Sequence, residues 1–200
     1  DILRDPRSTI DYDAARASLI EERVRAIGSD GKLVPDADGA VCHVTLMEKL
    51  LVPLLSKLSN LVPDGGIWLN TQRPEWNDAN NALVGSGVSV VTLCYLRRYV
   101  AFLEGLLSRA PDARSSVSRE VVRWFGSVRA ILGDEARRHP GGIDDRERKR
   151  LMDALGEAFG SYRREVYTGG FSGKTDLRPG EIAALCRDAL VLIDRDIRAN

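Results

Sequence analysis

The sequence is poor in side chains that bind metals or carry out redox chemistry, with two histidines and three cysteines in 200 residues. Cys42, Cys94 and Cys186 are far apart and form no CxxC pair, which argues against a disulfide framework and against a zinc site. We therefore expect no metal and no cofactor. Cys94 and Cys186 fall in apolar helical patterns, where a free cysteine is typically buried. Free thiols favour a reducing compartment and predict a cytoplasmic protein.

The sequence also lacks net charge and long apolar runs. Lys and Arg together number 29, as do Asp and Glu, so no overall field attracts nucleic acid or an anionic membrane. The longest apolar stretch, MEKLLVPLLSKLSNLV, is interrupted by Lys49, Pro53 and Lys57 and is too broken to span a bilayer. The N-terminus DILRDPRST lacks the order of charged and apolar residues that is typical of a signal peptide. We expect neither a nucleic-acid partner nor a membrane partner.

Apolar residues recur at spacings of three and four, which predicts helix over most of the chain. Because 44% of the side chains are hydrophobic, a chain of this length can bury a substantial core. The pattern predicts an all-α fold of antiparallel helical hairpins in a single domain, residues 1–200. The expected helices cover residues 11–27, 45–61, 88–107, 117–138, 144–168 and 179–198.

Three of these helices carry more detailed expectations. The first has an apolar face formed by five residues: Ala15, Leu19, Ile20, Val24 and Ile27. The second begins at Thr45, which together with Glu48 has the spacing of a capping box, and Pro53 should kink it or split it in two. The helix over 88–107 is apolar on most of its faces, which predicts an inner helix packed between others.

Two short motifs suggest chemistry but do not meet its requirements. GGFSGKTD ends like a phosphate-binding P-loop, but the glycine required five residues before Gly173 is replaced by Thr168, and helix rather than strand precedes it. We expect a flexible interhelical loop there, which Tyr167 and Phe171 would let flank a ligand. Cys42 and His43 are adjacent in sequence, and neighbouring side chains rarely face each other as a nucleophile and its base must.

The stretch 73–90, RPEWNDANNALVGSGVSV, begins in a predicted loop over residues 62–87, after the short extended segment GGIWLN. Sugars need hydrogen-bonding groups for their hydroxyls and aromatic rings for their C–H faces. The stretch supplies both, through Glu75, Trp76, Asn77, Asp78, Asn80 and Asn81. Cleavage of a glycosidic bond also needs a carboxylic acid. On chemistry alone an alternative remains open, in which Asp78 caps a helix, the asparagines satisfy a turn and Trp76 packs at its entry.

The segment EWNDANNALVGSGVSV resembles the DWND-G-x-N-x-x-G segment and following Ser-containing helix start of the cellobiose-phosphorylase-like inverting glycoside phosphorylases. That family includes chitobiose phosphorylases and the phosphorylase-like part of cyclic β-1,2-glucan synthases. The resemblance implies an (α/α)6 barrel with this segment as a loop at its active-site end. The family's general acid follows Trp-Asn and matches Asp78, while Glu75 stands where the family usually has Asp. Ala79 replaces the usual glycine, and nothing around His43 or His139 resembles the family's phosphate-binding region.

The hypothesis from the resemblance is that the chain belongs to a carbohydrate-active enzyme that cleaves an oligosaccharide with inversion, by hydrolysis or phosphorolysis. Asp78 would be the general acid and Trp76 the platform for a sugar ring. Hydroxyls would be oriented by Glu75, Asn77, Asn80 and Asn81, and Arg73 would pair with Glu75 or with an anionic co-substrate such as phosphate.

Twelve barrel helices need about 300 residues or more. The expected six or seven helices would therefore form part of a barrel, completed by the rest of a longer chain or by a homo-oligomer. The alternative is a non-catalytic helical module that binds carbohydrate or protein.

Overall fold

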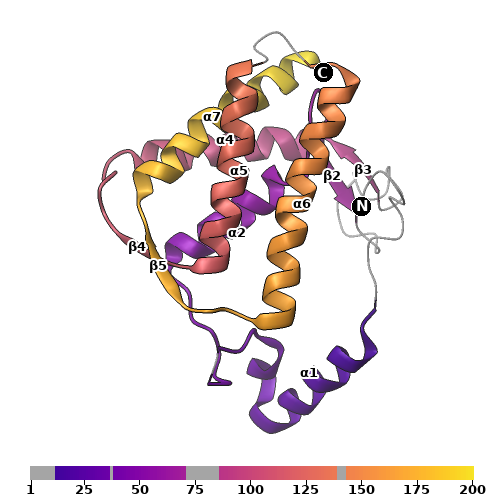
Figure 1. The fold of residues 1–200 in the computed structure, drawn as a ribbon, viewed down its shortest axis with the longest axis vertical. Coiled ribbons are helices and arrows are strands. Elements are labelled where there is room, and N and C mark those ends of the chain that lie inside the picture. The colour runs from indigo at the N-terminus through magenta and orange to yellow at the C-terminus, as the bar shows by residue number, and fades with distance from the viewer. Residues whose placement is uncertain (1–11, 37, 71–85, 139–142) are drawn as a thin grey trace.

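The computed structural model describes residues 12–36, 38–70, 86–138 and 143–200. This part of the chain is mostly helical, as predicted, with two small sheets added (Figure 1). None of its helices is long and apolar enough to cross a membrane. The helices are α1 (Ala14–Ile27), the short 3-10 helix η1 (Gly28–Lys32), α2 (Leu46–Leu58), α4 (Val90–Leu107), α5 (Arg119–Arg138), α6 (Asp145–Gly169) and α7 (Pro179–Ala199).

The two sheets are antiparallel. β1 (Leu61–Val62), β2 (Gly66–Asn70) and β3 (Ser86–Ser89) pair in the order β1-β2-β3, so the extended segment predicted at GGIWLN is confirmed as β2. β4 (Ser115–Ser118) pairs with β5 (Lys174–Leu177), which joins the segment before α5 to the segment before α7. Only GGIWLN was expected to be extended, so the other strands are additions to the predicted all-α pattern.

Side-chain caps fix the starts of several helices close to the predicted positions. The carboxylate of Asp13 accepts a hydrogen bond from the N–H of Arg16 at 2.9 Å, and that of Asp144 accepts one from the N–H of Glu147 at 2.8 Å. Such caps satisfy the first amides of a helix, which have no partner within it. The expected helices at the C-terminal half of the chain therefore agree with α5, α6 and α7 to within one or two residues.

Helix α2 differs from the prediction at its capping box, at Pro53 and at its end. Thr45 does cap it, accepting from the N–H of Glu48 at 3.3 Å, but Glu48 does not complete the capping box. Its side chain is buried and accepts instead from the N–H of Ser118 at 2.9 Å and from the Lys174 ammonium at 3.0 Å. Pro53 lies inside α2 without splitting it, and the helix ends at Leu58, three residues earlier than expected.

The core forms where α2, α4, α5 and α7 meet. α4 packs most extensively against α7, and α5 packs against both α6 and α7; α5 and α6 stand beside each other in Figure 1. The Tyr99 hydroxyl on α4 donates to the Leu50 carbonyl on α2 at 2.8 Å, which ties these two helices together. Cys186 is buried as predicted, and burial raises the pKa of its thiol to about 12.

Helix α4 is not the fully enclosed inner helix that its composition predicted. One side is buried through Leu93, Leu96, Val100, Leu103 and Leu107. The opposite side is exposed, and the prediction that Cys94 is buried is wrong for the same reason. An apolar composition indicates that a helix can be covered on all sides, but it cannot say whether a neighbour is present to cover it.

Helix α1 also leaves most of its predicted apolar face exposed, since only Ile20 and Val24 of that face are partly buried. None of its residues is buried, and the helix packs chiefly against η1. At its start, the Arg16 guanidinium donates to the carbonyl of Tyr167 at the end of α6 and lies 5.2 Å from the centre of the Tyr167 ring. The helix therefore stands apart from the core, at the lower end of Figure 1.

Substitution of Gly66 tests how tightly β2 and β3 pack together, and substitution of Gly126 on α5 is the control. Gly66 has φ of 145°, and a Cβ there would lie 2.8 Å from the Ser89 carbonyl oxygen. We expect Gly66→Ala to lower the free energy of unfolding by about 1–3 kcal/mol, because side chains rarely adopt this backbone conformation. Gly126→Ala, at an exposed α5 position with open space around it, should raise it by up to about 1 kcal/mol. Urea denaturation measures both, and equal effects would contradict the prediction.

Candidate functional site

The residues that the sequence singles out lie on a segment whose two ends are fixed by a strand pair. Arg73, Glu75, Trp76, Asn77, Asp78, Asn80 and Asn81 fall within residues 71–85, outside the described part of the chain. Their placement therefore stays a prediction. Strands lie on both sides of this segment, within the stretch that was expected to be a loop. β2 ends at Asn70, β3 begins at Ser86, and these two residues are paired.

The β2–β3 pair is anchored in the core on one side and to α4 on the other. Ile67 of β2 is fully buried, and the register continues from Ile67 opposite Ser89 to Asn70 opposite Ser86. Ser89 ends β3 and caps α4, accepting from the N–H of Thr92 at 3.1 Å. Asn70 and Ser86, which flank residues 71–85, therefore lie side by side, and β3 leads directly into the N-terminus of α4.

Trp68 on β2 is a polar donor near this position that the sequence analysis did not single out. Its indole N–H is buried and has no hydrogen-bond partner among the described residues. Buried polar groups normally have a partner, so this N–H is available to a hydroxyl or carbonyl brought to the hairpin. The local signal was only the sequence GGIWLN, which resembles any half-buried strand.

The glycine-rich stretch GGFSGKTD is hydrogen-bonded rather than flexible. The Lys174 ammonium donates to the Glu48 carboxylate at 3.0 Å and to the Ser118 hydroxyl at 2.8 Å, and Ser172 donates through both its hydroxyl and its backbone N–H to Glu120. A lysine occupied in this way by a buried carboxylate is not free to hold a phosphate. The structure therefore replaces the expected flexible loop by a fixed connection that leads into β5.

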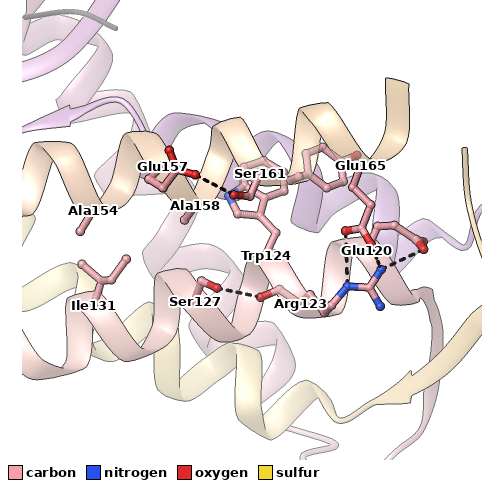
Figure 2. A pocket seen from close by; sticks show the side chains of 11 residues that line it. Glu120, Arg123, Trp124, Ser127, Ile131, Ala154, Glu157, Ala158, Ser161 and Glu165 are labelled. Carbon is pink, nitrogen blue, oxygen red and sulfur yellow. Dashed lines mark hydrogen bonds and ion pairs between the residues drawn. The ribbon is translucent and has the colours of Figure 1, made fainter. Parts of the chain in front are cut away.

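A cavity of about 420 Å³ lies between α5 and α6 (Figure 2). Trp124 lies between the two helices, with Glu120, Arg123 and Glu165 grouped towards one end and Glu157 with Ser161 towards the other. Small side chains on both helices, Ser127 on α5 and Ala154 and Ala158 on α6, leave the space open. The sequence analysis did not predict this cavity, because its walls come from two helices with no shared motif.

Trp124 has a structural role in this cavity. Its ring stacks on Phe159, with centroids 4.9 Å apart, and on Tyr162, with centroids 4.4 Å apart. Its indole N–H donates to the Ser59 hydroxyl at 3.1 Å, and only 2% of the residue is exposed. A sugar ring needs a free aromatic face, and this one is already covered.

Two carboxylates beside the cavity, Glu120 and Glu157, have lowered pKa values. Burial raises the pKa of Glu120, but hydrogen bonds from Ser172 and the nearby Arg123 guanidinium outweigh this, so that its pKa is lowered. The Ser161 hydroxyl and the Arg164 guanidinium lower the pKa of Glu157. Arg123 also forms an ion pair with Glu165. A general acid needs a raised pKa, so neither Glu120 nor Glu157 is suited to protonate a leaving group.

A second group of charged residues lies around the β1–β2 turn, and two of them, Glu135 and Asp196, are buried. Arg195 on α7 lies 3.5 Å from a Glu135 carboxylate oxygen on α5 and 3.7 Å from one of Asp64 in the turn. Arg148 on α6 contacts the other Asp64 oxygen at 3.2 Å. Asp196 is fully buried beside Arg195; burial raises the pKa of Asp196 to about 6, although Arg195 opposes this. The group joins the turn that leads into β2 to three helices.

Among the described residues, no group of three His, Cys, Asp or Glu side chains is placed to hold a metal ion. No protein-family model matches the chain, and a search of curated proteins found no match. The geometry around the β2–β3 pair and the sequence of residues 73–81 are therefore the observations on which a function can be proposed.

The raised pKa of Asp196 predicts a specific pH dependence of stability. Between about pH 4 and pH 6 the folded chain binds a proton at Asp196 that the unfolded chain releases, so stability due to this residue falls as the pH rises through that range. We compare the free energy of unfolding of the natural chain with that of the Asp196→Asn variant. As the pH rises, the difference between them should fall by at most about 3 kcal/mol and level off above about pH 7. Urea denaturation at several pH values measures it, with Asp188→Asn as the matched control. A difference that does not change with pH would contradict the assignment.

Proposed function

We propose that the chain is a segment of a carbohydrate-active enzyme that cleaves glycosidic bonds with inversion, and that Asp78 is its general acid. The observation that carries the proposal is the segment EWNDANNALVG, which supplies an acid, an aromatic ring and several amides within eleven residues. These are the groups that binding and cleaving an oligosaccharide require. The resemblance to the cellobiose-phosphorylase-like family assigns the acid role to Asp78.

In this proposal each group of the segment has one task. Asp78 gives its proton to the glycosidic oxygen as the bond breaks, and the attacking group arrives from the opposite face of the sugar, as inversion requires. Trp76 stacks on the sugar ring, and its apolar surface helps to keep Asp78 protonated near neutral pH. Hydroxyls are oriented by Glu75, Asn77, Asn80 and Asn81. Arg73 pairs with Glu75, or with phosphate where phosphate is the attacking group.

The β2–β3 pair supports the proposal because a catalytic group must be positioned accurately. Sites built on rigid elements hold their geometry better than sites on unsupported loops. Here Asn70 and Ser86 are paired directly before and after the segment, and β3 continues into the capped start of α4. The indole N–H of Trp68, which has no partner within the described part of the chain, adds a donor to the same hairpin.

We also propose that the described helices are part of an (α/α)6 barrel. Two observations support the proposal that further helices pack against the described ones. One face of α4 and one face of α1 are apolar and exposed. Large exposed apolar faces usually mark a surface that binds another protein segment. The missing helices would come from a longer chain or from a second copy.

The exposed face of α4 also favours a second candidate function, a non-catalytic helical module that binds carbohydrate or protein. The two functions differ in what residues 73–81 do. In a catalytic segment they bind sugar and turn it over, in a carbohydrate-binding module they bind without turnover, and in a protein-binding module they do neither.

Substitution of the acid tests the catalytic proposal. In the full-length enzyme we expect Asp78→Asn to lower the turnover of β-linked glucose disaccharides by roughly a hundredfold or more, because an amide cannot donate the proton at the required moment. The Michaelis constant should change little, since the amide keeps the size and most hydrogen bonds of the acid. Sugar release is measured with and without added phosphate. Asp112→Asn, an exposed carboxylate outside the segment, is the control, and near-normal turnover in Asp78→Asn would remove this residue from the mechanism.

Titration calorimetry tests binding separately from turnover. We expect β-glucan oligosaccharides and their disaccharides to bind the natural chain and to bind Trp76→Ala at least tenfold more weakly, because stacking on an aromatic ring is lost (roughly 1 kcal/mol or more). Trp124→Phe is the matched control, since Trp124 is a buried tryptophan whose ring is already stacked on Phe159 and Tyr162. No heat with any of these sugars would favour the protein-binding alternative.

A further inference from the structure

Helix α4 carries an apolar stripe along its exposed side. Val91 is 65% exposed, Tyr95 64%, Phe102 62% and Leu106 42%. These positions follow one another at steps of four, seven and four, so they lie on one side of the helix. Arg98 is exposed between Tyr95 and Phe102 and is the charged residue of the stripe.

Helix α1 carries a second exposed stripe, formed by Ala15, Leu19, Glu22 and Ala26. Leu19 is 58% exposed. The two alanines make this stripe narrow, so another helix can approach it closely, and Glu22 is its charged residue. The less exposed residues Ile20 and Val24 lie elsewhere on α1.

The two stripes have the same spacing. Positions 15, 19, 22 and 26 and positions 91, 95, 98 and 102 both advance by four, three and four residues, which is the seam of two helices packed as a coiled coil. With the helices parallel and in this register, four layers form: Ala15 with Val91, Leu19 with Tyr95, Glu22 with Arg98, and Ala26 with Phe102. The small alanine of α1 then meets the large phenylalanine of α4, which fills space without a clash.

The charges of the two stripes are also complementary. In the register above, Glu22 faces Arg98, and neither residue has an ion-pair partner within the described ranges. Arg98 lies 6.0 Å from the centre of the Tyr95 ring, a contact that does not neutralise its charge. Opposite charges inside a seam favour one register and one partner, while like charges there are strongly disfavoured.

The two stripes do not meet within one copy of the chain. In Figure 1, α1 lies at the lower end of the molecule and α4 crosses behind α5 in the upper half. Arg16 holds the start of α1 against Tyr167 at the end of α6. A second copy has no such restriction, and a two-fold axis would form the contact twice, once with each α1.

We propose that two copies of this chain form a symmetric dimer in which α1 of each copy packs parallel to α4 of the other, with Glu22 against Arg98. The dimer does not depend on the catalytic role of Asp78. The dimer goes beyond the proposed function because it assigns α1 of the second copy to the exposed face of α4.

Charge reversal tests the proposal, with the molar mass in solution measured by sedimentation equilibrium. The natural chain should be a dimer at micromolar concentrations. Arg98→Glu and Glu22→Arg should each weaken the dimer by roughly tenfold or more, because each places two like charges in both contacts. The chain with both changes should dimerise again. Arg109→Glu, an exposed arginine past the end of α4, is the control and should not alter the mass. Circular dichroism confirms that each variant remains helical.

Mixing the two single variants identifies the contact as one between copies. A mixed dimer has Glu at position 98 facing Arg at position 22 in one contact and the natural pair in the other, so the mixture should regain dimer that neither variant forms alone. A monomeric natural chain, or a mass unaffected by either reversal, would overturn the proposal. Recovery in the doubly changed chain but not in the mixture would also overturn it, because α1 would then pack on α4 of its own chain.

Discussion

The arrangement of the two halves of the chain depends on the hydrogen bonds that the buried carboxylate of Glu48 accepts. This carboxylate accepts from the N–H of Ser118, just before α5, and from the ammonium of Lys174 at the start of β5, while Lys174 also donates to the Ser118 hydroxyl. A buried carboxylate without such partners would cost several kcal/mol. Because of these bonds, α2, the β4–β5 pair and the beginning of α5 can come together in one way, and this in turn fixes where α5 presents Trp124 and Glu120 to α6.

The helices were predictable and the connections between them were not, for a physical reason. Helices depend on neighbours three and four residues away, so periodicity and caps such as Asp144 give α5, α6 and α7 to within one or two residues. Strands β4 and β5 pair across about 60 residues of sequence, and no local pattern contains that information. Glu48 shows the same limit: its spacing from Thr45 predicts a capping box, but Lys174, far along the chain, decides where its side chain goes.

Some parts of the candidate site can be expected from the sequence, and others cannot. A candidate group within a few consecutive residues, as in EWND, can be picked out from sequence, and its role stays a proposal because residues 71–85 lie outside the described ranges. The strand that leads to it was expected from GGIWLN, but its pairing with β3 was not. The cavity between α5 and α6 could not be predicted, since Glu120 and Arg123 are neighbours on one helix whereas Glu157, Ser161 and Glu165 reach them only through packing.

The pairing of Asn70 with Ser86 holds the two chain ends that flank residues 71–85 side by side. When two chain ends are already fixed side by side, lengthening the connection between them adds an entropy cost that grows only with the logarithm of its length. The entropy cost of closing the β2–β3 pair therefore changes little with the number of residues between Asn70 and Ser86, and the pair, with Ile67 in the core and Ser89 at the start of α4, tolerates connections of different lengths.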